Sequence, residues 1–208
     1  MNLHMPQDPE SESELKNLAA VPYQIISPAN NAAIIGIYQD SMLGCYRFTR
    51  EKIDFSHKDA MNLLMMFNRI NPNMFKNKLD LKDQRITNFE ILSQIMPPFT
   101  LKVKNKQYDA DKETADTSNN IIEIINGKYI RGQMDKGILG AGTKGLIHRA
   151  CNDFGNMAAS QFIDDLQNVI TEYMKQSAFS VGISDIVTDA KTNDTIISII
   201  TEKKTDVK

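Results

Sequence analysis

The segment Ile121-Ile-Glu-Ile-Ile-Asn-Gly-Lys-Tyr-Ile-Arg-Gly-Gln133 carries the strongest local structural signal in the chain. Two β-prone runs flank the central pair Asn126-Gly127. Asn-Gly is the preferred pair of a two-residue type I′ turn, because both turn positions need a positive φ. The segment therefore predicts a β-hairpin.

A further strand is predicted just upstream of this hairpin. From Phe99 to Lys104, apolar residues alternate with polar ones, which is the period-two pattern of a half-buried strand. Residues 105–119 are charged, small and polar, and they contain no large aliphatic side chain. This linking segment is therefore predicted to be irregular.

Helices are predicted on both sides of these strands from N-caps and from apolar residues at three-and-four spacing. The predicted segments are residues 12–18 after Ser11, a helix opened by Ser56 and Asp59, a short helix opened by the Thr87–Glu90 capping box, and residues 143–153, 156–176 and from about 192 onward. The stripe from Ala159 to Tyr173 is the longest, and it predicts a helix buried along one face. Ile196 to Ile200 keep an apolar face near the end, which indicates a surface that needs a partner.

The composition excludes several classes of protein. The chain has 208 residues, and 41% apolar residues with 24% charged residues are typical of a packed globular chain. No stretch approaches the roughly 18 apolar residues of a membrane span. Cys45 and Cys151 match neither a disulfide framework nor a zinc site, so a reducing compartment is expected. The net charge of −2 argues against binding of nucleic acid by this chain alone.

Three other patterns have simpler interpretations than catalysis. Gly140 to Gly145 matches the dinucleotide-binding pattern G-x-G-x-x-G. The acidic residue that such a site requires about 20 positions later would lie inside a long helix. A tight strand-to-helix turn is therefore favoured over a dinucleotide site. His148 is interpreted as a satisfied, partly buried imidazole. The pair Asp164-Asp165 is interpreted as a solvated helix face.

Several stretches resemble, in order, the largest subunit of multisubunit DNA-directed RNA polymerases. MNLHMPQ at the start resembles the segment after the metal-binding loop of that family, where NADFDGDE runs into MNLHxPQ. The other similar stretches are LAAVPYQIISPANN (Leu18–Asn31), GIYQDSMLG (Gly36–Gly44), ITNFEILSQIMPP (Ile86–Pro98), IINGKYIRGQMDKGILGAGTKGLIHRA (Ile124–Ala150) and FSVGISD (Phe179–Asp185). The form is similar to RNA polymerase II or to the enzyme of large DNA viruses.

The resemblance implies an α+β fold in two parts. Residues 1–155 would form the pore domain, with mixed helices, short antiparallel strands and the hairpin. Residues 156–208 would form a long helix and the helical start of the funnel domain. In the family these domains surround the secondary channel beneath the active centre, through which nucleotides enter.

The resemblance also implies roles for individual residues. Asn2, His4 and Gln7 would lie beside the metal loop and help to hold its geometry. Lys136 would line the pore on the side where nucleotides enter and attract a triphosphate. The family often has a second lysine next to it, where this chain has Gly137.

The catalytic metal is expected to lie outside this chain. Polymerisation in the family is a two-metal phosphoryl transfer that uses Mg²⁺. The three aspartates of the metal loop would precede Met1, and no D-x-D-x-D cluster occurs in the 208 residues. The chain alone is therefore expected to be inactive and to contain no catalytic residue, with Mg²⁺ bound only in the assembled enzyme.

The implied partners are the remainder of the largest subunit, the second-largest subunit and other polymerase subunits, with transcript-cleavage factors as further partners. DNA template, RNA and nucleoside triphosphates would join in the assembled complex, and no membrane is expected. The implied location is the nucleus for a eukaryote, and the host cell or virion for a virus. The alternative function is a non-catalytic, polymerase-derived interaction module that binds polymerase subunits or cleavage factors.

Overall fold

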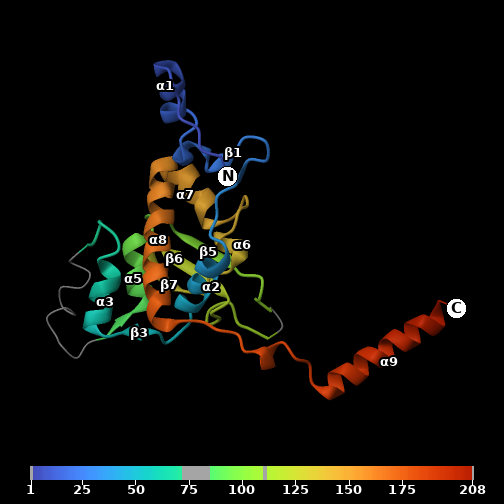
Figure 1. Cartoon of the computed structure of the whole chain (residues 1–208). Helices are drawn as coiled ribbons and strands as arrows, with labels where there is room; N and C mark the ends of the chain where they lie inside the picture. The colour runs from blue at the N-terminus through green and yellow to red at the C-terminus, as the bar shows by residue number, and fades with distance from the viewer. Residues whose placement is uncertain (1, 72–84, 110–111, 208) are drawn as a thin grey trace. The chain divides into compact units, whose positions relative to one another are not determined.

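The computed structural model describes residues 2–71, 85–109 and 112–207 (Figure 1). Its helices are α1 (Pro9–Asn17), α2 (Gln39–Phe48), α3 (His57–Leu64), α5 (Asn88–Ile95), α6 (Lys136–Leu139), α7 (Leu146–Phe154), α8 (Asn156–Ser177) and α9 (Ala190–Asp206), with 3-10 turns η1 (Val21–Gln24) and η3 (Ile183–Asp185). Its strands are β1 (Ile26–Ser27), β2 (Ala32–Ala33), β3 (Asp54–Phe55), β4 (Ile86–Thr87), β5 (Leu101–Lys104), β6 (Ile121–Ile125) and β7 (Lys128–Arg131). The strand pairs of the described residues are antiparallel, which confirms the predicted α+β class.

The predicted hairpin forms two strands of a three-stranded sheet in the order β5-β6-β7. Asn126 and Gly127 have φ values of +47° and +75°, as a type I′ turn requires. Because β6 is antiparallel to both neighbours, β5 and β7 run in the same direction and end at the same edge of the sheet. That edge brings together the segments that follow β5 and β7.

The long helix α8 supplies one wall of the hydrophobic core, as its apolar stripe predicts. Its buried apolar residues are Ala159, Phe162, Leu166, Val169, Ile170 and Tyr173. The Tyr173 ring meets the Phe48 ring of α2 edge-on, with 4.9 Å between centroids. A Cβ on Gly44 would lie 2.4 Å from Cγ2 of Ile170, so this glycine lets α2 and α8 approach closely.

Capping chemistry correctly predicts where α3 and α5 begin. The Ser56 hydroxyl accepts the N–H of Asp59 at 3.3 Å, and Thr87 with Glu90 forms the complete capping box. α3 ends at Leu64, earlier than the apolar spacing predicts. Residues 73–85 are polar, rich in lysine and without periodicity, which predicts a loop, and this stretch lies outside the described residues except at its last position.

Two other helices differ from the prediction. Asp8 caps α1 by accepting the N–H of Ser11 at 2.7 Å, so Ser11 is not the cap. Pro9 is the first residue of this helix, where proline is tolerated because the first-turn amide that it lacks has no partner within a helix. α2 is not predicted at all, since only Gly44, Cys45 and Phe48 are buried and the apolar signal is weak.

The chain forms two compact units, Met1–Gln176 and Ser177–Lys208. α8 lies in the first unit up to Gln176. The boundary of the pore domain at residue 155 is a family definition and stays a prediction. In the second unit, α9 exposes Ile196, Ile197, Ile199 and Ile200. Within the described residues, no helix is both long enough and apolar enough to cross a membrane.

We predict that Gly132→Ala destabilises the fold much more than Gly155→Ala. Both glycines have a left-handed φ, +112° and +85°, which costs about 1–3 kcal/mol for a residue with a side chain. A Cβ on Gly132 would also lie 2.3 Å from Cα of Ile122, whereas nothing lies within 4 Å of a Cβ on Gly155. Gly132→Ala should therefore cost about 1–3 kcal/mol more, measured by urea unfolding. Gly142→Ala, which has open space and no left-handed φ, is the control, and equal losses for the two tested variants would contradict the steric argument.

Candidate functional site

The candidate site is built around the short helix α6, which carries Lys136. The Asp135 carboxylate caps this helix, and its Oδ1 accepts the N–H of Ile138 at 3.1 Å. Ile138 and Leu139 are buried, while Lys136 is exposed. The helix is therefore fixed to the core through one side and presents the ammonium of Lys136 on the other.

The same carboxylate holds a second segment of the chain. Oδ2 of Asp135 accepts the backbone N–H of Lys106 at 3.0 Å. Lys106 follows β5 by two residues, and Asp135 follows β7 by four, so both leave the shared edge of the sheet. Asp135 therefore joins two segments that lie 29 residues apart in the sequence.

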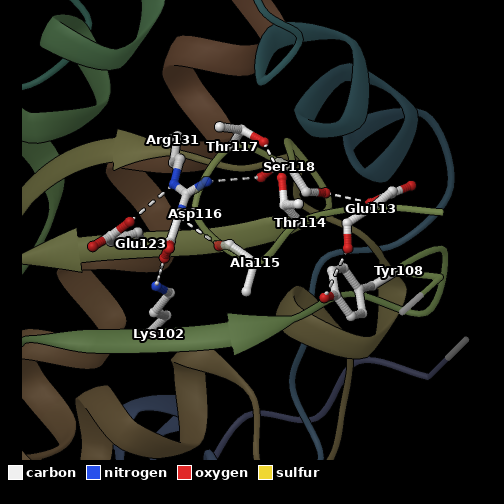
Figure 2. A network of polar contacts seen from close by, with 10 residues as sticks. All are labelled: Lys102, Tyr108, Glu113, Thr114, Ala115, Asp116, Thr117, Ser118, Glu123 and Arg131. Atoms are coloured by element: carbon white, nitrogen blue, oxygen red, sulfur yellow. Dashed lines mark hydrogen bonds and ion pairs between the residues drawn. The ribbon is translucent and has the colours of Figure 1, made fainter. Parts of the chain in front are cut away.

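The segment between β5 and β6 is held by a network of polar contacts, which Figure 2 shows. Arg131 of β7 is its centre: Nε donates to Glu123 at 2.9 Å, and the terminal nitrogens donate to the carbonyl oxygens of Ser118 and Ala115 at 3.3 and 2.9 Å. The Glu113 carboxylate accepts hydrogen bonds from Ser118 and Asn120. Among its described residues, the segment predicted to be irregular thus has no helix or strand, yet hydrogen bonds hold it from Glu113 to Asn120.

A buried asparagine connects this network to the site. The Asn105 side chain donates to the carbonyl of Gln133 at 3.3 Å and to Asn120 at 3.2 Å. One residue further on, the N–H of Met134 donates to the hydroxyl of Thr49 at 2.9 Å. The chain that leads into Asp135 is therefore held at two successive residues.

The glycines from Gly140 to Gly145 form a tight turn between α6 and α7, not between a strand and a helix as predicted. A Cβ on Gly145 would lie 2.7 Å from the carbonyl oxygen of Ile138. Gly36 packs against the turn with equal closeness, since its Cβ would lie 2.8 Å from the amide nitrogen of Ala141. The turn follows no parallel strand in the described residues, so the glycines serve close packing, and the dinucleotide interpretation loses its structural context.

Asn2, His4 and Gln7 lie in the extended segment before α1, and all three side chains are exposed. His4 lines a surface hollow of about 470 Å³ together with Leu15 of α1 and Leu18, which follows that helix. Within the described residues these three side chains make no hydrogen bond to Lys136 or to the segments around it. The predicted role beside a metal loop therefore stays a prediction.

Two buried polar side chains differ from their sequence interpretations. Asp165 is only 6% exposed, so the prediction of a solvated face is wrong for this residue. Burial raises the pKa of its carboxyl, and the hydrogen bond from Gln161 at 2.7 Å offsets part of this effect. His148 is buried as expected, and its Nδ1 contacts the amide of Asn152 at 3.4 Å, but its Nε2 has no partner among the described residues.

Within the described residues, the side chains do not form a binding set for Mg²⁺. No group of three or more His, Cys, Asp or Glu side chains gathers in the described part of the chain. Both oxygens of Asp135, the carboxylate nearest Lys136 in sequence, already accept backbone N–H groups. We therefore assign no metal ligand within residues 2–71, 85–109 and 112–207.

Comparisons with known proteins identify relatives of the chain. A family model described as RNA polymerase Rpb1, domain 3, matches residues 24–186. The DNA-directed RNA polymerase II subunits RPB1-A and RPB1-B of Trypanosoma brucei brucei are each 30% identical to the chain over 202 residues. These matches cover 95% of the chain and 11% of each relative.

We predict that Asp135→Ala lowers the free energy of unfolding by about 1–2 kcal/mol, because the variant loses the cap of α6 and the bond to Lys106. Thermal or urea unfolding followed by circular dichroism measures the change. Asp189→Ala is the matched control, since Asp189 stands at the same position of α9 but makes no side-chain cap bond. Equal stability changes for the two variants would show that the Asp135 contacts contribute nothing.

Proposed function

Since the chain belongs to the family of RNA polymerase largest subunits, at the segment described as Rpb1 domain 3, we propose that it forms part of the nucleotide pore in an assembled DNA-directed RNA polymerase. The pore would be the secondary channel that leads nucleoside triphosphates to the active centre. The chain spans 11% of the length of its trypanosome relatives, and catalysis would be a property of the whole assembly.

The observation that carries this proposal is the exposed Lys136 on a helix anchored through Asp135, Ile138 and Leu139. An ammonium group attracts phosphate oxygens as a point charge and contributes little directional preference. Lys136 would therefore raise the local concentration of any nucleoside triphosphate, whatever its base. This property suits a passage shared by four different nucleotides.

Asn2, His4 and Gln7 would act by positioning the neighbouring metal loop rather than by touching substrate. Side chains that hydrogen-bond to metal ligands orient them and tune metal affinity. In the assembled enzyme, Mg²⁺ would supply activation of the RNA 3′-hydroxyl and neutralisation of the leaving pyrophosphate. The exposure of all three side chains leaves their polar groups available for that contact.

The partners in this proposal are the rest of the largest subunit, the second-largest and other polymerase subunits, with template DNA, RNA and transcript-cleavage factors. The relationship to RNA polymerase II subunits of a eukaryote favours a nuclear location.

A second candidate function is a polymerase-derived interaction module without a catalytic partner chain. The four exposed isoleucines of α9 favour it, because an apolar helix face of this kind is stabilised by a partner. The two proposals differ in the coding sequence next to this chain. A neighbouring reading frame that ends in NADFDGDE supports the pore, and the lack of such a frame in the genome supports the module.

We predict that Lys136→Ala in the assembled polymerase raises the KM for all four nucleoside triphosphates by about two- to fivefold, with kcat nearly unchanged, because a lost charge weakens attraction without altering the reacting atoms. Steady-state incorporation on a primed template measures both constants. Lys144→Ala, another exposed lysine eight residues away, is the control for net charge. Unchanged KM values for Lys136→Ala would contradict the proposed role of Lys136 in the pore.

We predict that His4→Ala raises the Mg²⁺ concentration needed for half-maximal activity of the assembled enzyme by about tenfold, the lower range for groups that orient metal ligands. The measurement is a Mg²⁺ titration of nucleotide incorporation. His57→Ala, which changes a histidine in the first turn of α3, is the control. The same Mg²⁺ dependence for wild type and His4→Ala would contradict the positioning role.

A further inference from the structure

Two adjoining surface hollows lie where the end of α5 meets α8 and the turn between β6 and β7. The first has a volume of about 220 Å³ and contains Asp165 of α8, and the second has a volume of about 280 Å³ and contains Lys128 of β7. The residues that line both hollows are Arg69, Gln94, Met96 and Pro98. Because the hollows share this boundary, one ligand can occupy both.

The first hollow holds a buried hydrogen-bond acceptor. Asp165 is 6% exposed, and its Oδ1 accepts a hydrogen bond from the amide of Gln161 at 2.7 Å. Its other oxygen, Oδ2, accepts no hydrogen bond within the described residues, yet these residues do not enclose it completely. An unpaired buried acceptor costs about 1–3 kcal/mol, so the hollow favours a ligand that supplies an O–H or N–H group.

The walls of the first hollow are aromatic and apolar. Phe154 and Phe162 line it together with Pro97. The Phe154 ring is 37% exposed and packs against the buried Phe99 ring, with 6.2 Å between centroids. These walls suit a flat apolar side chain, and the acceptor on Asp165 adds a preference for a donor at its tip. Tyrosine combines both properties, and its hydroxyl usually finds a partner when it is buried.

The second hollow is cationic. Arg69 and Lys128 are exposed, neither makes an ion pair or a hydrogen bond with another residue in the described ranges, and no Asp or Glu is among the described residues that line this hollow. The backbone on both sides is held. The N–H of Asn71 donates to a glutamine side chain of α5 at 2.8 Å, and the N–H of Gly127 donates to the carbonyl of Phe99 at 3.1 Å. Two positive charges are thus presented from anchored segments to an acidic ligand.

The size and charge of the two hollows favour a peptide over a cofactor or a nucleic acid. Each hollow is smaller than the roughly 300–1,000 Å³ of a typical small-molecule site. Arg69, Lys128 and Asp165 leave one net positive charge, whereas a groove for single-stranded nucleic acid follows its backbone with positive charge along several nucleotides. An extended peptide places side chains i and i+2 on one side, about 7 Å apart, so two such side chains can fill adjoining hollows.

We propose that the two hollows form a docking site for an extended peptide segment of a partner protein, which presents a tyrosine to the first hollow and a glutamate or aspartate to the second. The tyrosine hydroxyl donates to Oδ2 of Asp165, and the tyrosine ring contacts Phe154. The acidic side chain lies two residues away in the peptide and pairs with Arg69 and Lys128. This site is distinct from the proposed nucleotide pore, because Lys136 lines neither hollow.

The test titrates the purified 208-residue chain with short acetylated and amidated peptides and follows binding by NMR. The reference peptide is Tyr-Ala-Glu-Ala-Tyr, which has a tyrosine two residues from its glutamate on either side and therefore fits in either chain direction. Wild type is expected to bind it about tenfold more tightly than Phe-Ala-Glu-Ala-Phe, the low end for a hydrogen bond to a charged group. Replacing the glutamate of the peptide with glutamine should weaken binding about two- to fivefold, as expected for exposed charges.

Variants of the chain assign each preference to its hollow. Asp165→Ala is expected to abolish the preference for tyrosine over phenylalanine and to retain the preference for glutamate over glutamine. Asp164→Ala, which removes the exposed neighbouring carboxylate, is the matched control and should keep both preferences. Arg69→Ala and Lys128→Ala should each reduce the glutamate preference by about twofold and leave the tyrosine preference unchanged. Arg149→Ala, which changes an exposed arginine of α7 outside both hollows, is the control for net charge.

The peptide pairs are compared on the wild type itself, so the proposal stays testable even where unfolding temperatures show that a variant does not fold. Equal affinities for the tyrosine and phenylalanine peptides, equal affinities for the glutamate and glutamine peptides, or no measurable binding of the reference peptide would each overturn it. Tighter binding of a single-stranded oligouridine RNA that is lost in Arg69→Ala would assign the site to nucleic acid and overturn it as well. The titration contains no nucleotide triphosphate and the Lys136→Ala kinetics contain no peptide, so the failure of either proposal leaves the other standing.

Discussion

The half-buried ion pair between Arg131 and Glu123 is the interaction on which the arrangement of the polar segment depends. The two side chains are 15% and 25% exposed, so the pair is better shielded from solvent than a surface ion pair. The same guanidinium also donates to the carbonyl oxygens of Ser118 and Ala115. One side chain thereby supplies donors that a helix or a sheet would otherwise provide. Removing the Arg131 side chain would leave the Glu123 carboxylate and the two carbonyl groups without their hydrogen-bond donor.

The geometry of the candidate site depends on the arrangement of this polar segment and of the three-stranded sheet. The antiparallel order β5-β6-β7 makes the two outer strands end at one edge of the sheet, roughly two strand spacings of about 4.8 Å apart. Asn105 and Asp135 then join the segments that leave this edge. The network holds the described part of the path from β5 to β6, and the hydrogen bond from Lys106 to Asp135 keeps the start of this path next to the short helix α6.

Sequence reasoning succeeds in this fold where the determining chemistry is local. Asn126-Gly127 and the Thr87–Glu90 capping box each identify an element through contacts among neighbouring residues. It fails where the outcome depends on tertiary contacts: Asp165 is buried although it follows another aspartate, and α2 is held by a few close contacts to α8. The hydrogen bond from the Lys106 N–H to Asp135 is missed for the same reason, because it spans 29 residues.

The net charge of −2 does not decide whether α6 could attract the phosphates of the proposed nucleotide ligand. At physiological salt, charges more than about 8 Å apart are largely screened from each other. The electrostatic field at α6 therefore depends on the neighbouring charges and not on the net charge of the chain. The exposed Lys136 supplies a positive charge there, and the N–H groups directed at the Asp135 carboxylate weaken its repulsion of phosphate. The resulting attraction is modest, as expected for exposed charges. In the proposed pore, modest affinity would suit the wall of the passage, because a nucleotide held tightly there would not move on to the active centre.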